Sequence, residues 1–160
     1  MSTEARAKEA IAKAGSANEA MQAAVAALKD RPDYSWVGIY LLDGNELVLG
    51  PYLGKPSPHT RIPLGRGICG AAASEKQTII VDDVNADPRY LACSVDTKSE
   101  IVAPIMIDGE VLGEIDIDSD KAAAFGEEDR VLVEAVAAML APILSADRSG
   151  VRGFGGSGVR

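Results

Sequence analysis

The stretch EIVAPIMIDGEVLGEIDIDS (residues 100–119) decides the fold that we expect for this chain. It consists of two runs rich in valine and isoleucine, 100–108 and 109–118, which meet at the pair Asp108-Gly109. An Asp-Gly pair between such runs is among the strongest sequence signals for a tight hairpin turn. The stretch therefore predicts two antiparallel strands.

The residues upstream predict a second hairpin and further extended segments. SWVGIYLLD (35–43) and ELVLGPYLG (46–54) are strand candidates joined by a turn at Asp43-Gly44-Asn45. Residues 61–76 predict a short extended piece, a glycine-rich turn and a brief helix of small residues. TIIVDD (78–83) predicts one more strand.

Helices are expected near both ends of the chain. Residues 3–14 are rich in strong helix formers, and Ser16 with Glu19 forms a capping-box pattern that opens a second helix ending near Lys29. Residues 127–145 predict the last helix. Its spacing places four side chains inward: Leu132, Val136, Leu140 and Ile143.

The order of these elements predicts an α+β fold, with a single antiparallel sheet and the N- and C-terminal helices packed on one face. We expect one domain over residues 1–146 and a flexible Gly-rich tail over 147–160. Residues 84–99 show no periodicity and predict a long polar connection. Such a connection inside a compact domain often carries function.

Composition narrows the class of protein. The length of 160 residues, with 47% hydrophobic and 25% charged residues, suits one globular domain. A net charge of −8 argues against a nucleic-acid surface and against binding to an anionic membrane. No apolar run approaches the roughly 18 residues of a membrane span, and the first residues lack a signal-peptide core. We therefore expect a cytoplasmic protein.

The two cysteines are the first candidates for chemistry, because cytoplasmic thiols stay reduced and a pair is more often catalytic or metal-binding than structural. Cys93 lies in the polar connection and is either a nucleophile or an idle small residue. Cys69 lies at a predicted helix start, where backbone N–H groups favour a lowered thiol pKa. It either resolves a sulfenic acid on Cys93 or only packs a helix of small residues. Two cysteines and one histidine cannot complete a four-ligand zinc site without carboxylates.

Three acidic residues alternate with isoleucine near the end of the hairpin. Glu114, Asp116 and Asp118 therefore share one face of the predicted strand, where they repel one another. A substrate ammonium or a metal ion relieves that repulsion; alternatively, the three acids form a solvated edge. The spacing from Asp116 to Glu127 also resembles a calcium loop, although Lys121 occupies the place of its glycine.

Three other residues carry candidate roles, and His59 carries none. Glu100 opens a strand after the polar connection and is a candidate proton donor, or else a surface glutamate. Trp36 and Tyr40 lie on one strand face, where they form either an aromatic wall for a methyl or sulfonium-like group or part of the core. His59 lies between a proline and Arg61 and is expected to be an exposed loop residue.

Together, these stretches resemble the GAF-domain free methionine-(R)-sulfoxide reductases. The resemblance spans roughly residues 34–145 and rests on SWVGIYLLDGNELVLGPYLGK, RIPLGRGICGAAA, YLACSVDTKSEIVAPI and GEIDIDS. It implies a six-stranded antiparallel sheet, a homodimer, and reduction of free methionine (R)-sulfoxide to methionine. The site residues that it implies are the catalytic thiol Cys93, a second thiol Cys69, the substrate-binding carboxylates Glu100, Asp116 and Asp118, and the aromatic pair Trp36 and Tyr40.

The implied reaction uses a thioredoxin-like reductant and needs no metal or organic cofactor. The resemblance departs at two places: His59 stands where the family carries a third cysteine, and Arg89-Tyr90-Leu91 precedes Cys93 in place of Gly-His-Ile. Resolution of Cys93 therefore falls to Cys69 or to an external thiol. The alternative is a non-enzymatic GAF domain that binds or senses a small molecule.

Overall fold

The hairpin at Asp108-Gly109 forms as predicted. In the computed structural model, which describes residues 1–91 and 96–150, strand β5 (Ser99–Ile107) pairs antiparallel with β6 (Glu110–Ser119). Asp108 and Gly109 have φ angles of 52° and 80°, which match the positive-φ pair of a type I′ turn. The register places Ile101 opposite Ile117 and Glu100 opposite Asp118.

Six antiparallel strands make up the sheet, in the spatial order β3-β2-β1-β6-β5-β4. The remaining strands are β1 (Trp36–Asp43), β2 (Glu46–Leu53), β3 (Arg61–Pro63) and β4 (Ile79–Val81). The second predicted hairpin, between β1 and β2, is thereby confirmed. The short 3₁₀ helix η1 (Val84–Ala86) interrupts the segment that was expected to be a featureless connection.

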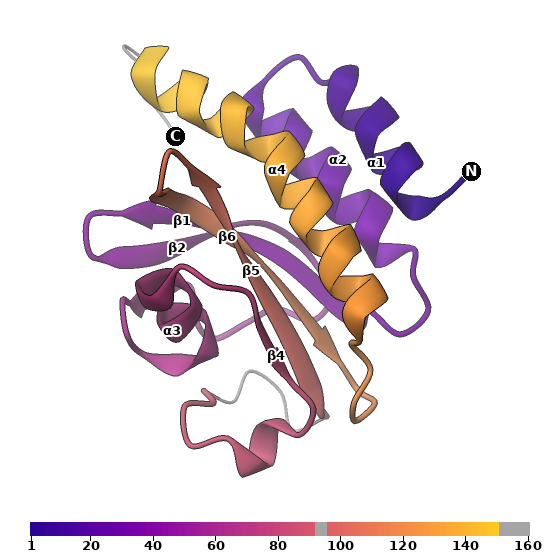
Figure 1. Cartoon of the computed structure of the whole chain (residues 1–160), viewed down its shortest axis with the longest axis vertical. Coiled ribbons are helices and arrows are strands. Elements are labelled where there is room, and N and C mark those ends of the chain that lie inside the picture. The colour runs from indigo at the N-terminus through magenta and orange to yellow at the C-terminus, as the bar shows by residue number, and fades with distance from the viewer. Residues whose placement is uncertain (92–95, 151–160) are drawn as a thin grey trace.

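The two faces of the sheet carry different helices (Figure 1). Helices α1 (Thr3–Ala12), α2 (Ala17–Lys29) and α4 (Glu127–Gly150) cover one face, and the short α3 (Gly67–Glu75) lies on the other. The Ser16 hydroxyl accepts a hydrogen bond from the Glu19 N–H at 3.1 Å, which caps α2 as its sequence predicts. The α+β fold with terminal helices on one face is therefore confirmed.

Helix α4 continues to Gly150, beyond the end near residue 145 that the sequence predicts. Leu132, Val136 and Leu140 are buried as expected, whereas Ile143 is half-buried and Leu144 takes the inward position. Residues 151–160 lie outside the described part of the chain, so the division at residue 146 stays a prediction.

Strand alternation separates two hydrophobic clusters. Ile39, Ile101, Ile115 and Ile117 point toward the three long helices and are fully buried. Burying a side chain of this size contributes about 1.5–3 kcal/mol. The opposite face holds a smaller cluster around α3 together with the acidic residues of β6.

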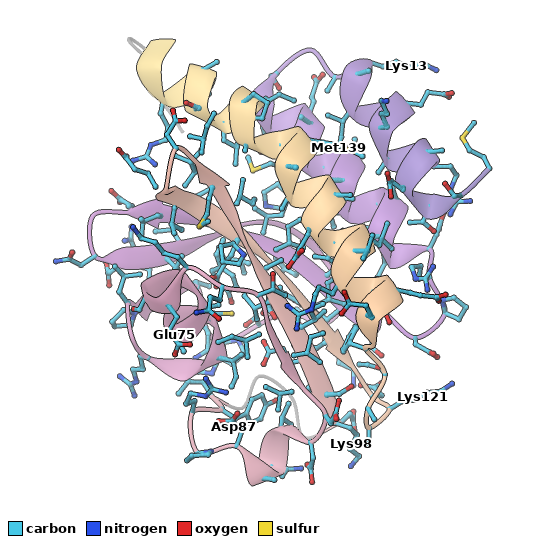
Figure 2. All side chains as sticks on the ribbon, in the orientation of Figure 1. Lys13, Glu75, Asp87, Lys98, Lys121 and Met139 are labelled. Carbon is cyan, nitrogen blue, oxygen red and sulfur yellow. The ribbon has the colours of Figure 1, made fainter. Side chains whose placement is uncertain are left out.

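Charged side chains gather at the surface; Lys13, Lys98 and Lys121 point away from the sheet (Figure 2). Within the described residues, none of the helices combines the length and the apolar character needed to cross a membrane.

Candidate active site

The three acids of β6 are buried. Glu114, Asp116 and Asp118 have exposures of 0%, 1% and 4%, and they face α3 rather than water. Their shared strand face was predicted, but the solvated-edge interpretation is wrong. We call this side of the sheet the acidic face, defined by Glu114, Asp116, Asp118 and Glu100.

Strand register gathers the other predicted residues on the acidic face. On β1, Trp36 is opposite Asp118 and Tyr40 is opposite Glu114. On β5, Glu100 is opposite Asp118 and is 4% exposed, so the surface-glutamate alternative is wrong. Residues far apart in the chain meet because side chains of paired positions in a sheet point to the same side.

Cys69 lies on helix α3, which packs against the acidic face. It is the third residue of α3, is 5% exposed, and its Sγ lies 4.0 Å from Glu100 Oε2. The helix approaches the sheet edge closely at Gly70, where an added Cβ would lie 2.8 Å from the Pro63 carbonyl oxygen. Only glycine fits this contact without a shift, and the contact fixes the height of the thiol above the sheet.

The predicted lowering of the Cys69 pKa is wrong. Burial raises the pKa of this thiol well above its ordinary value, and the charges of Asp116 and Glu114 raise it further. A helix start favours the thiolate by a modest amount, whereas desolvation and nearby carboxylates act in the opposite direction and dominate here.

The acids also disfavour one another's ionised forms. Burial raises the pKa of Glu114 and of Asp118 well above their ordinary values, and the charge of Asp116 adds to both shifts. Burial likewise raises the pKa of Asp116. Among the described residues, no ion pair involves Glu114, Asp116 or Asp118. Both oxygens of Glu114 and one oxygen of each aspartate also lack a hydrogen-bonding partner there.

Replacing Glu114 with glutamine is expected to change the pH dependence of stability. Because the folded-state pKa of Glu114 is raised, the folded protein holds its proton when the unfolded chain has lost it. Stability is therefore full below the ordinary pKa of 4.5 and falls as the pH rises toward the folded-state value. Glutamine cannot ionise, and its NH₂ group can donate to the unpaired oxygen of Asp116.

Urea unfolding at pH 5 and pH 8, with chelator present, measures this effect. We expect similar stability at pH 5 and a gain of about 1–3 kcal/mol for Glu114→Gln at pH 8. Glu110→Gln is the matched control, because Glu110 is the first residue of β6 and is exposed. Parallel pH curves for wild type and Glu114→Gln would contradict the prediction.

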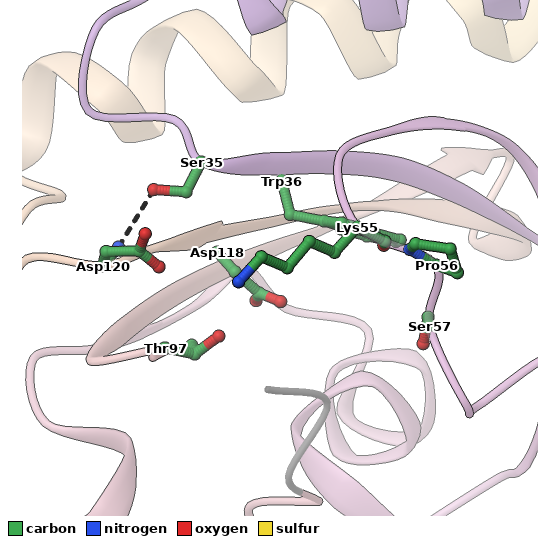
Figure 3. Close-up of a pocket in the computed structure, with 8 residues that line it drawn as sticks. All are labelled: Ser35, Trp36, Lys55, Pro56, Ser57, Thr97, Asp118 and Asp120. Atoms are coloured by element: carbon green, nitrogen blue, oxygen red, sulfur yellow. Dashed lines mark hydrogen bonds between the residues drawn. The ribbon is translucent and has the colours of Figure 1, made fainter. Parts of the chain in front are cut away.

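Two cavities open on the acidic face. The larger, about 70 Å³, is lined by Trp36 and Asp118 with Ser35, Lys55 and Thr97 among its other residues (Figure 3). The Lys55 side chain runs along it, and its ammonium pairs with Asp96 Oδ2 at 3.0 Å. This cavity therefore joins an aromatic wall to opposite charges, which suits a small zwitterion.

The smaller cavity, about 10 Å³, lies beside the thiol. Tyr40, His59, Cys69, Glu100 and Asp116 line it, with Leu91 among the rest. His59 lies in the loop between β2 and β3 as predicted, but it is half-buried, so its predicted exposure is wrong. The Tyr40 hydroxyl donates a hydrogen bond to the His59 carbonyl at 2.8 Å, which holds this loop against the sheet.

Trp36 and Tyr40 share a strand face but do not line one cavity. Trp36 stacks on Tyr52 with ring centroids 5.6 Å apart, and its Nε1 donates to the Lys55 carbonyl at 2.9 Å. Its indole also covers Gly38, where an added Cβ would lie 2.3 Å from the ring. The tryptophan is thereby fixed at the mouth of the larger cavity.

Gly38→Ala is expected to displace this indole. The new methyl group has no room, so we expect a loss of stability of about 1–3 kcal/mol and an altered emission spectrum. Trp36 is the only tryptophan of the chain, so its fluorescence reports on this site alone. Gly126→Ala is the control, because nothing lies within 4 Å of its added Cβ. An unchanged emission spectrum for Gly38→Ala would contradict the placement of the Trp36 indole over Gly38.

Cys93 belongs to residues 92–95, which lie outside the described part of the chain. The calcium-loop interpretation is wrong, because Asp116 and Asp118 belong to a regular strand that runs to Ser119. The described residues offer one cluster of potential metal ligands, Cys69, Glu100 and Asp116, and it involves neither Asp120 nor Glu127.

Sequence reasoning missed Lys55 and the cavity position of His59. Lys55 forms an ion pair with Asp96, Nζ to Oδ2 3.0 Å, across 41 positions of sequence. The pair joins the segment after β2 to the residue that directly follows 92–95. No local pattern signals it, because both partners lie in irregular segments whose meeting depends on the sheet order.

Comparison with known proteins identifies the family to which the chain belongs. The family model described as GAF domain matches residues 16–144. GAF domain-containing protein A of Dictyostelium discoideum is 50% identical over 105 residues, covering 65% of this chain and 66% of that protein. The free methionine-R-sulfoxide reductase of Escherichia coli is 38% identical over 113 residues, covering 71% and 68%. Across the curated relatives, the match spans 61–68% of their own lengths.

Solved structures agree with this result. The free methionine-R-sulfoxide reductase of Neisseria meningitidis, in complex with its substrate, superposes with a TM-score of 0.87 at 36% identity, covering 93% of this chain and 90% of that one. The resemblance found in the sequence is therefore confirmed: the chain belongs to the GAF domain family and, within it, to the free methionine-R-sulfoxide reductases.

Proposed function

We propose that this chain reduces free methionine (R)-sulfoxide to methionine, with the Cys93 thiolate as the nucleophile. The relatives that carry this activity in their names support the reaction. The observation that carries the proposal is the acidic face: four carboxylates are buried beside a thiol, and three of them enter no described ion pair. Such an arrangement is costly unless a cationic ligand completes it.

In our proposal, the ammonium group of the substrate is the cation that pairs with these buried carboxylates. Asp116 and Asp118 bind this group, and each has one oxygen without a hydrogen-bonding partner in the described structure. A methionine sulfoxide inside a peptide has no free ammonium, which accounts for a preference for the free amino acid. The bound substrate joins the two cavities in this proposal, so that Trp36 in one and Tyr40 in the other enclose its methyl sulfoxide end.

The chemical step transfers oxygen from sulfur to sulfur. Glu100 donates a proton to the sulfoxide oxygen, which makes the sulfoxide sulfur more electrophilic. The Cys93 thiolate attacks that sulfur and forms an S–S bond. The hydroxyl group then passes from the methionine sulfur to the cysteine sulfur as the S–O and S–S bonds break, so methionine leaves with the S–S electron pair and Cys93 becomes a sulfenic acid. The sulfoxide is reduced by two electrons and the thiol is oxidised by two.

Resolution restores the thiol. Cys69 or an external thiol attacks the sulfenic sulfur and releases water, and a thioredoxin-like reductant then reduces the disulfide. The raised pKa of Cys69 makes it a poor nucleophile until the negative charge around it falls, for example by protonation of the acids.

Methionine release from a racemic mixture of the free sulfoxide, with dithiothreitol as reductant, tests the function. We expect loss of one epimer only, the (R) form, and no reduction of N-acetylmethionine sulfoxide, which lacks the ammonium. Reduction of both compounds at equal rates would remove the ammonium assignment. No turnover, together with a change in Trp36 fluorescence on adding the sulfoxide, would favour the non-enzymatic binding domain instead.

We also propose that the protein works as a homodimer in the cytoplasm with a thioredoxin-like donor. Light scattering on the purified protein tests the dimer, and coupling to thioredoxin and its reductase tests the donor. A monomeric mass at micromolar concentration would contradict the first of these proposals.

A further inference from the structure

Three side chains with metal-binding atoms converge on the acidic face from different elements. Cys69 Sγ on α3, a carboxylate oxygen of Glu100 on β5 and one of Asp116 on β6 all lie within 4.8 Å of one another. All three residues are buried. Donors held by helices and strands keep their positions better than donors on loops.

Part of this donor set has no partner in the described structure. Asp116 Oδ1 is buried without a hydrogen bond, and Asp116 lines the small cavity together with Cys69 and Glu100. The neighbouring Glu114 leaves both of its oxygens unpaired. The cavity of about 10 Å³ has room for roughly one water molecule, so it suits a single ion.

We propose that Cys69, Glu100 and Asp116 form a zinc-binding site, with a fourth position open to water. One thiolate and two carboxylates with an open fourth position are a donor set that tetrahedral Zn²⁺ accepts. Ca²⁺ and Mg²⁺ take oxygen ligands and gain nothing from the sulfur.

The geometry needs only a small adjustment. Tetrahedral zinc holds its ligand atoms about 3.3–3.8 Å apart, and Cys69 Sγ already lies 4.0 Å from Glu100 Oε2. The other separations are at most 4.8 Å, so the side chains must rotate to bring the donors to that spacing. The metal displaces the thiol proton of Cys69 and any proton held by Glu100 or Asp116, so only protons leave and no electrons move.

Zinc at this position would inhibit the enzyme, because Glu100 and Asp116 also serve the substrate and Cys69 is the candidate resolving thiol. This competition rests on the proposed function, whereas the binding of zinc does not. The two parts are therefore measured separately.

Binding is measured on the reduced full chain, freed of metal and of reductant. Zn²⁺ is titrated against a chromophoric chelator, and Co²⁺ is titrated in parallel because its thiolate complexes absorb in the near ultraviolet. We expect one Zn²⁺ per chain and a cobalt–thiolate band. In Cys69→Ser, the affinity should fall at least about tenfold and the band should disappear. Asp116→Asn should weaken binding and keep the band.

Two controls locate the site. Cys93→Ser should retain the band, and Glu110→Gln should bind zinc as the wild type does, because Glu110 is an exposed acid far along the same strand. Equal zinc affinity in wild type, Cys69→Ser and Asp116→Asn would overturn the proposal. A cobalt band that depends on Cys93 rather than Cys69 would overturn it as well.

Inhibition is measured with the wild type and free methionine sulfoxide. Added zinc should raise the apparent KM, as expected of a competitor. If zinc binds at Cys69 and KM stays constant, the competition is refuted while the metal site stands. Absence of turnover even in metal-free protein would instead count against the proposed function and leave the binding result intact.

Discussion

Cys93→Ser is expected to lose methionine sulfoxide reduction by at least about a thousandfold, whichever reductant is supplied. Removal of a nucleophile leaves only the rate that binding and electrostatics provide, and losses of this size are typical. Serine is close in size to cysteine, so the change should not disturb packing. Methionine release at saturating substrate is the measurement.

Cys69→Ser separates the two thiols. With dithiothreitol, which resolves the sulfenic acid directly, we expect this variant to keep most of its turnover. With a thioredoxin system, we expect turnover to fall if Cys69 forms the disulfide that thioredoxin reduces. Loss of activity in Cys69→Ser but not in Cys93→Ser, with dithiothreitol, would reverse the assignment of the nucleophile.

Glu100→Gln is expected to lower kcat by about 10²–10⁴-fold, which is the usual contribution of a positioned general acid. Glu100 is buried, faces the thiol of Cys69 at 4.0 Å and pairs in register with Asp118. Glutamine keeps the shape and one hydrogen-bond donor but cannot deliver a proton. KM should change little, because the proposed ammonium contacts of Asp116 and Asp118 remain.

Separate measurement of kcat and KM distinguishes proton donation by Glu100 from substrate binding by Glu100. A rise in KM with unchanged kcat would show that Glu100 binds the substrate rather than donates a proton. Full turnover in Glu100→Gln would remove it from the chemistry altogether. Glu110→Gln, which lies on the surface, controls for the change in net charge.

Much of the fold can be predicted from the sequence because its signals are local. Asp43-Gly44-Asn45 and Asp108-Gly109 mark the hairpins, and the pattern of Ser16 and Glu19 marks the start of α2. The common face of Glu114, Asp116 and Asp118 likewise follows from strand alternation.

What covers that face cannot be predicted in the same way. Helix α3 is 9 residues long and nearly all small, so it has no amphipathic pattern to show which side faces the sheet. The burial of Glu114, the raised pKa of Cys69 and the cavity position of His59 all depend on how α3 and the loop before it pack. These are long-range properties, and no window of sequence contains them.

The alternation of isoleucine and acidic residues in β6 also restricts the evolution of this strand. Its isoleucines support the three long helices while its acids, one position away, line the proposed site. A single inserted or deleted residue before Glu114 would exchange the two sets, placing carboxylates in the helix-packed core and isoleucines in the ligand site. Point substitutions can accumulate along this strand, but a change in its length by one residue would remove the fold and the chemistry together.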